Sequence, residues 1–200
     1  MIDTLNTYAR KLPAWAVYLI GFAPMPFLFW QGITGALGVD PVKALEHEYG
    51  ELALQLLVLG LAITPARRHL GLNLLKFRRA IGVLSFFYVL AHLLVWAVLD
   101  VQALGAVWAD ILKRPYITIG MAAFALLLPL AITSNNRSVR KLGPRWRQLH
   151  KLTYPAVILG GVHYVWLVKG WQVEPLIYMA VILTLLALRA PKKRKVRVAA

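Results

Sequence analysis

His92 and His163 lie deep inside two separate apolar stretches, and His150 lies thirteen residues before His163. An ionisable side chain inside a membrane segment is costly and usually has a function. Imidazoles that face one another from adjacent helices can ligate a haem iron from both sides. The three histidines therefore suggest an electron conduit across a bilayer.

The composition is that of a membrane protein. Of the 200 residues 60% are hydrophobic, with a mean hydropathy of +0.63, whereas a soluble domain is about 45–50% apolar. The net charge of +15 raises the question of nucleic acid, but the basic residues cluster between and after apolar stretches, which argues against it. The chain has no cysteine, which excludes disulfides, iron–sulfur clusters and thiol catalysis.

Six apolar segments approach the roughly 20 residues that a membrane-spanning helix needs. We expect an all-α integral membrane bundle of six transmembrane helices, forming one domain over residues 1–200. Pro24 and Pro26 should kink the first helix, and the second and sixth segments are short. The expected spans are 12–30, 49–64, 80–99, 115–133, 149–168 and 175–188.

The N-terminal third carries two further expectations. The first apolar run is long and contains prolines, and no small-residue cleavage site follows it, so we expect an uncleaved helix rather than a signal peptide. The loop over residues 31–46 should hold a short surface helix, capped by Asp40 with Pro41 at its first position.

The distribution of positive charge predicts the orientation. Eighteen Lys and Arg residues fall on the side that holds both termini, and four fall on the other side. This bias places both termini in the cytoplasm, so the third and fifth spans both run outward. Tryptophans near the outer interface are typical of an aromatic belt; they are Trp30, Trp96, Trp108, Trp166 and Trp171.

His92 and His163 are expected at matching depth. His92 lies fourteen residues beyond Arg78, which is close to the start of the third span, and His163 lies fourteen residues beyond Leu149, where the fifth span starts. At about 1.5 Å per residue both are about 21 Å from the cytoplasmic end, in the outer half of a core about 30 Å thick. Two imidazoles at one depth can clamp a single haem iron; the alternative for each is a hydrogen-bonded core histidine.

His150 lies about 20 Å below His163 and could ligate an inner haem. The matching position on the third span is Arg78, with Arg79 beside it, and arginine pairs with a propionate or a flavin phosphate rather than with iron. Thirteen residues of straight helix also leave the two rings about 140° apart, unless Pro155 shifts that phase. The alternative is an interfacial histidine among basic residues.

The other polar groups near the spans have simpler interpretations. His69 lies in a basic loop and is expected to be solvated. The run Glu46–Glu48 and the following Glu51 could bind a metal weakly or relay protons, but a solvated cluster is favoured. Gln55, one turn after Glu51, leaves a proton or quinone role open.

The chain lacks a glycine-rich dinucleotide fingerprint and a soluble region that could hold nicotinamide. Gly105, Gly120 and the pair at 160–161 lie on or near apolar helices, where small residues commonly serve packing. Electrons must come from a membrane-soluble carrier, a bound flavin or another protein. Basic loop residues could hold a flavin phosphate, or simply touch anionic lipid as a topology signal; they are Arg78, Arg79, Arg145 and Arg147.

Several short motifs, in order and spacing, resemble the ferric-reductase-like transmembrane domain. More closely, nearly the whole chain resembles the haem-binding membrane subunits of bacterial methionine sulfoxide reductase systems. The motifs are Glu46-His47, Tyr88-Val-Leu-Ala-His92, Arg114-Pro-Tyr116, Arg145-Trp-Arg-Gln-Leu-His150-Lys-Leu-Thr-Tyr154 and Val162-His163-Tyr164-Val-Trp166.

The resemblance implies that electrons pass from the quinol pool, or from a cytosolic flavin reductase, through heme b and FMN. The acceptor would be a periplasmic, molybdopterin-dependent methionine sulfoxide reductase subunit. The family's haem histidines fall on His92, His150 and His163, so one or two haems are implied, and Arg78 stands where two-haem relatives have a histidine.

We therefore expect an electron-transfer subunit rather than a complete enzyme. One alternative is a self-sufficient ferric or quinone reductase of the same fold, against which the missing dehydrogenase domain weighs. The other is a non-haem membrane transporter, whose histidines relay protons or merely pack. Inverted repeats with broken helices would support a transporter, and the sequence shows no such pair.

Overall fold

The computed structural model describes residues 1–168 and 172–189, and every regular element within them is helical. Lys169, Trp171 and the basic tail after Arg189, which the topology prediction used, lie outside the described residues. Among the described residues, four helical segments are long and apolar enough to cross a membrane: Ala14–Ile33, Pro41–Leu70, Leu75–Asp100 and Pro115–Ile132. The chain is thus an α-helical membrane bundle, and the count of six spans stays a prediction.

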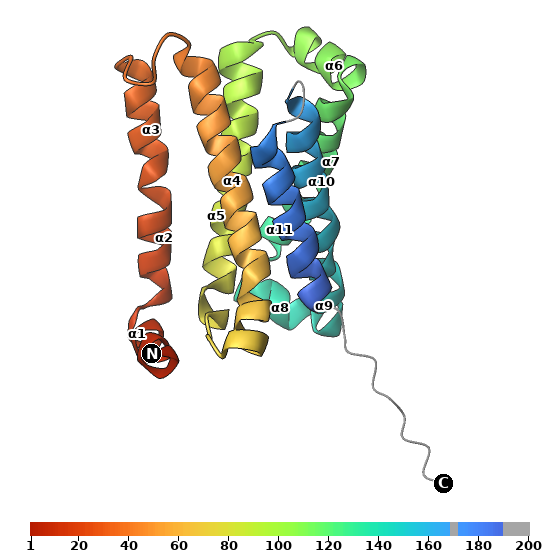
Figure 1. Cartoon of the computed structure of the whole chain (residues 1–200). Helices are drawn as coiled ribbons and strands as arrows, with labels where there is room; N and C mark the ends of the chain where they lie inside the picture. The colour runs from red at the N-terminus through yellow and green to blue at the C-terminus, as the bar shows by residue number, and fades with distance from the viewer. Residues whose placement is uncertain (169–171, 190–200) are drawn as a thin grey trace.

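Within the described part of the chain, five long helices form a closed ring. α4 packs against α5 and α11, α7 packs against α5 and α10, and α10 packs against α11. α5 and α10 run in the same direction, from the end that carries α8 and α9 (Figure 1). The five are α4 (Pro41–Pro65), α5 (Arg78–Leu94), α7 (Pro115–Ile132), α10 (Thr153–Leu167) and α11 (Val173–Arg189).

Shorter elements extend or connect these helices. A π-helical turn, Ala66–Leu70, extends α4; a 3₁₀ turn, Leu75–Phe77, precedes α5, and a π-helical stretch, Val95–Asp100, follows it. The separate short helices are α1 (Ile2–Lys11), α6 (Leu104–Lys113), α8 (Asn136–Leu142) and α9 (Pro144–Leu149).

An apolar cluster from four helices holds the ring together. Its buried members are all apolar, so close packing and dispersion, rather than hydrogen bonds between side chains, stabilise the contacts between these helices. Its buried members are Leu54, Leu57 and Leu61 of α4, Leu127 and Leu130 of α7, Ala156 and Val157 of α10, and Ile182 of α11.

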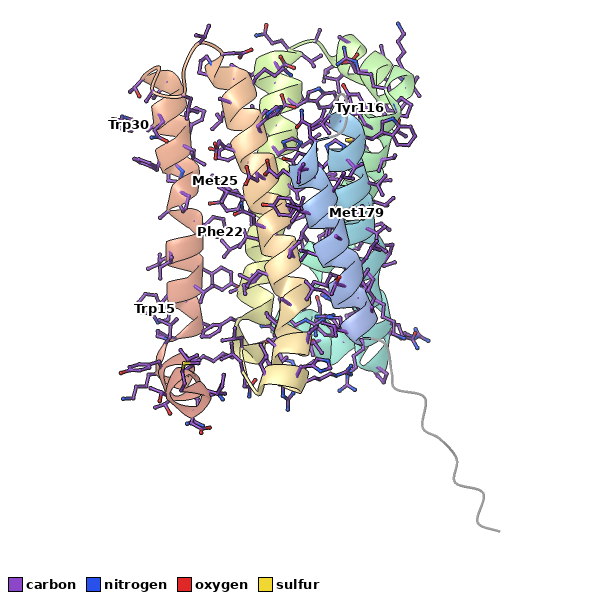
Figure 2. All side chains as sticks on the ribbon, viewed as in Figure 1. Trp15, Phe22, Met25, Trp30, Tyr116 and Met179 are labelled. Atoms are coloured by element: carbon purple, nitrogen blue, oxygen red, sulfur yellow. The ribbon has the colours of Figure 1, made fainter. Side chains whose placement is uncertain are left out.

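The first span is interrupted at Ala23, between α2 (Ala14–Phe22) and α3 (Pro24–Ile33). Pro24 begins α3, where its missing N–H costs no hydrogen bond. Figure 2 shows Trp15 and Trp30 at opposite ends of this segment. Neither half buries a residue, although α2 packs against α5 and α3 packs against α4.

Two tyrosines of the bundle bond to the backbone of this segment. The hydroxyl of Tyr49 donates to the carbonyl of Met25 at 2.7 Å, and that of Tyr88 donates to the carbonyl of Gly21 at 2.8 Å. The two rings also meet edge to face, 6.1 Å apart. They fix α2 and α3 against α4 and α5.

Tyr88→Phe should therefore lower stability by about 1 kcal/mol, because it removes a hydrogen bond and leaves the packing in place. The free energy of unfolding in detergent, followed by tryptophan fluorescence, measures the loss. Tyr8→Phe is the control, since Tyr8 is exposed on α1. Equal stability of the two variants would show that the Tyr88 hydroxyl does not hold the first span.

Two expected boundaries are wrong. The second span begins at Pro41 rather than residue 49: the short surface helix is the first turns of α4, where Asp40 accepts from the backbone N–H of Lys43 at 3.0 Å. The fifth span is not a continuous helix from residue 149, because a 3₁₀ turn at His150–Leu152 separates α9 from α10. Pro155 then lies in the first turn of α10.

Candidate functional site

The structure brings His92 of α5 and His163 of α10 together inside the ring of helices. Their ring centroids are 6.2 Å apart and their planes are inclined at 78°. The parallel course of α5 and α10 and the equal depth of the two residues produce this meeting. Two imidazoles in this relation can share one ligand between them.

A backbone carbonyl fixes each ring. Nδ1 of His92 lies 2.8 Å from the carbonyl oxygen of Glu46 on α4, and Nδ1 of His163 lies 2.7 Å from that of Tyr116 on α7. A carbonyl only accepts, so each Nδ1 carries the proton and donates it. Each Nε2 is then left with a free lone pair, the tautomer that a metal-ligating histidine needs.

Glycines make these two contacts possible. In a helix the side chain at position i+4 lies beside the carbonyl at position i, and here those positions are Gly50 and Gly120. A Cβ added at Gly50 would lie 3.0 Å from Nδ1 of His92, and one at Gly120 would lie 2.9 Å from Nδ1 of His163. The same arrangement thus occurs twice, once on α4 and once on α7.

These four supporting residues were not predicted. A backbone carbonyl carries no sequence signal, so nothing marked Glu46 or Tyr116 as a partner of a histidine. A glycine inside an apolar helix is the one visible sign, and Gly120 was assigned to helix packing. Gly120 lies four residues after Tyr116. The role of this spacing becomes visible only when the structure places His163 against the carbonyl of Tyr116.

Both histidines line a cavity of about 780 Å³. Its floor is apolar and belongs to the core cluster, through Leu54, Leu57, Leu127 and Ala156. Its other end lies near the starts of α4 and α7, where Figure 2 places Tyr116 at the end of the bundle. Charged and polar residues line that mouth: Lys43, Glu46, His47, Glu48, Glu51, Arg114 and Glu174.

The charges at the mouth differ in how they are paired. Lys43 bonds to Glu46 at 3.0 Å and to Asp100 at 2.6 Å, which ties the start of α4 to the end of the α5 segment. Arg114 lies 3.3 Å from Asp110 and donates to the hydroxyl of Tyr116 at 3.4 Å. The cavity therefore has an apolar floor, two imidazoles in its wall and a polar opening.

The acidic run on α4 does not form a metal centre. Among residues 1–168 and 172–189, no three His, Asp or Glu side chains converge as ligands. Gln55 instead donates to Glu51 at 2.8 Å and to the hydroxyl of Tyr178 on α11 at 3.1 Å. These groups tie α4 to α11 beside the cavity.

His150 lies towards the opposite end of the bundle and does not line the cavity. Its ring stacks on Trp146 with centroids 3.9 Å apart, and its Nε2 lies 3.1 Å from the hydroxyl oxygen of Thr133. Arg79 donates to Asn136 at 2.7 Å, and both Arg78 and Arg79 are exposed. The structure thus does not bring these three predicted site residues to the histidine pair.

Comparison with known proteins agrees with the geometry. Residues 49–161 match the family described as "Ferric reductase like transmembrane component". The chain is 50% identical over 196 residues to the protein-methionine-sulfoxide reductase heme-binding subunit MsrQ of Brucella ovis, of Brucella canis and of Brucella abortus (strain S19), covering 94% of this chain and 89% of each relative. No solved structure matches. The chain therefore belongs to the ferric-reductase-like transmembrane family and, within it, to the MsrQ family.

Proposed function

We propose that this chain is the b-type haem subunit of a methionine sulfoxide reductase system, with one iron held between His92 and His163. The observation that carries the proposal is the 6.2 Å between the two ring centroids. An iron bonded to one nitrogen of each ring at about 2 Å requires centroids about 6 Å apart, since each nitrogen lies about 1 Å from its centroid.

The residues around the pair fit a haem. Both Nε2 atoms are free of the carbonyl bonds that hold Nδ1, which is the donor set of a bis-imidazole site. The cavity of about 780 Å³ is apolar at its floor and polar at its mouth. A porphyrin has the same division, between a hydrocarbon ring and two carboxylates at one edge.

Haem bound here supplies one-electron chemistry, and the protein sets its position and potential. The carbonyls of Glu46 and Tyr116 hold the rings in place and, by accepting from Nδ1–H, make Nε2 a stronger donor. The apolar floor lowers the dielectric on one side of the pair, which helps to set the reduction potential of a haem bound there.

The proposed electron path runs from the quinol pool, or from a cytosolic flavin reductase, to a periplasmic molybdopterin-dependent catalytic subunit. Glu46 and Tyr116 lie within about 8 Å of the starts of α4 and α7 at about 1.5 Å per residue, so the pair is near one end of the bundle. The excess of Lys and Arg at the other end supports a periplasmic location for the end that holds the pair. In this proposal the chain is a six-span inner-membrane protein with both termini in the cytoplasm.

In this proposal the cytoplasmic end of the bundle, near His150, receives electrons from a cytosolic donor. Electrons from a cytosolic donor would arrive near His150, about 20 Å from the pair, whereas quinol can reach the pair through the bilayer. The exposed guanidinium groups of Arg78 and Arg79 at the starting end of α5 could hold the phosphate of FMN there.

An optical spectrum of the purified full-length chain tests this function. We expect a low-spin b-type spectrum that changes on reduction by dithionite, with one haem per chain by the pyridine-haemochrome assay. A colourless preparation would contradict the proposal and favour the transporter. Reduction of iron chelates without a partner would favour the self-sufficient reductase.

His150→Ala should leave the haem content and the low-spin spectrum unchanged. The reason is that the ring of His150 contacts Trp146 and Thr133 instead of the cavity. Pyridine-haemochrome quantification per chain measures the effect, beside the wild type prepared in parallel. Loss of half the haem would show that His150 ligates a second iron.

A further inference from the structure

The motif Arg114-Pro115-Tyr116 joins the mouth of the cavity to its histidine wall. Arg114 is the N-cap of α7 and Pro115 its first residue, so the backbone there is fixed. The carbonyl of Tyr116 holds His163 at 2.7 Å, and its hydroxyl accepts from Arg114 at 3.4 Å. The position of the guanidinium is therefore coupled to that of the imidazole.

The guanidinium of Arg114 has more N–H donors than it has partners among the described residues. A guanidinium carries five N–H groups, and within residues 1–168 and 172–189 the side-chain partners of Arg114 are Asp110 at 3.3 Å and Tyr116. The pair with Asp110 is an i,i+4 pair in which the Arg114 side chain is 52% exposed, and such pairs contribute little. Lys43, the other cation among the described lining residues, already contacts two carboxylates.

The rest of the mouth repels anions. The acids that line it stand on α4 and at the start of α11, opposite the α7 side, and they are Glu46, Glu48, Glu51 and Glu174. A carboxylate entering the cavity would avoid these groups and would be costly on the apolar floor. The α7 side, at Arg114, is where a negative charge is favoured.

We propose that Arg114 binds a propionate carboxylate of the haem and so sets which edge of the porphyrin faces the mouth. This inference rests on the proposed function, since the carboxylate belongs to a haem ligated by His92 and His163. The guanidinium is a positioning group: it acts on the edge of the ring, and a bidentate pair with the carboxylate gives it both strength and direction.

The test compares haem with its dimethyl ester, which has the same iron and ring but no charged carboxylates. Full-length apoprotein, expressed without haem synthesis, is titrated in detergent with each porphyrin, and the dissociation constant is read from the absorbance of the low-spin complex. Arg114→Ala should weaken binding of haem about tenfold, the value of a charge-assisted hydrogen bond. It should change binding of the dimethyl ester less than twofold.

Two further variants complete the design. Lys113→Ala removes the same charge from the neighbouring residue, which does not line the cavity, and should affect neither porphyrin. Arg114→Lys keeps the charge without the planar fork and should restore part of the haem affinity. A greater loss in Arg114→Lys than in Arg114→Ala would overturn the proposal.

The outcomes separate the two hypotheses. Equal losses for haem and the ester in Arg114→Ala, or no loss for either, would overturn the role of Arg114 while leaving the haem site intact. If the wild type forms no low-spin complex with either porphyrin, the histidine site itself is wrong and the role of Arg114 falls with it.

Discussion

Replacing either His92 or His163 by alanine is expected to abolish the low-spin b-type spectrum of the purified protein. Each variant leaves a single imidazole on one side of the cavity, and a haem held from one side loses both the second bond and its fixed orientation. We expect the haem content to fall at least tenfold, by pyridine-haemochrome quantification against chain concentration.

The control for this pair is His69→Ala, because His69 is exposed at the end of the π-helical turn and does not line the cavity. It should keep the wild-type spectrum. Both cavity variants must also remain folded, which near-unchanged helical circular dichroism would show. Full haem content in His92→Ala and in His163→Ala would remove the assignment of both ligands.

Gly50→Ala and Gly120→Ala should each weaken haem binding about tenfold, the lower end of what loss of a metal ligand's supporting contacts costs. The new methyl group would lie 3.0 Å from Nδ1 of His92 or 2.9 Å from Nδ1 of His163. That is closer than normal contact, so the ring must shift relative to its carbonyl and the Nδ1–H hydrogen bond is weakened. Titration of apoprotein with haem measures the affinity.

Gly82→Ala is the matched control on α5. A Cβ at Gly82 meets no atom within 4 Å, and alanine is the better helix former by about 1 kcal/mol, so this variant should bind haem normally. The double variant of Gly50 and Gly120 should bind more weakly than either single one. Wild-type affinity in both single variants would show that the rings do not need their carbonyls.

The meeting of His92 and His163 shows what the sequence could predict. The number of residues before each histidine, multiplied by the rise per residue of a helix, gives the depth of the two imidazoles. The distribution of Lys and Arg gives the direction of the two spans. These arguments place the two imidazoles at one depth, and the structure brings them within 6.2 Å. The residue spacing and the charge bias were sufficient here, because each histidine lies on a long apolar helix, α5 or α10.

The start of α4 shows where such arguments fail. Lys43 and Glu46 were assigned to a loop with a short surface helix, outside the second span, since hydropathy ends a span where charges begin. In the structure these residues continue the helix, because their side chains line the cavity mouth or pair with one another. The carbonyl of Glu46 could become a partner of His92 only through this extension.

The inner end shows a second limit. A continuous helix from residue 149 was expected, and its phase decided how His150 could relate to His163. The 3₁₀ turn at His150–Leu152 depends on the neighbouring contacts with Trp146 and Thr133. Such tertiary contacts are not encoded in local periodicity.

Electron paramagnetic resonance of the oxidised, haem-loaded protein tests the central claim most directly, because it reports the axial ligands of the iron. Ligation by two imidazoles whose planes are inclined at 78° predicts a low-spin, strongly anisotropic ferric signal, which disappears in His92→Ala and in His163→Ala. A high-spin signal in the wild type, or a low-spin signal that survives both substitutions, would contradict the account.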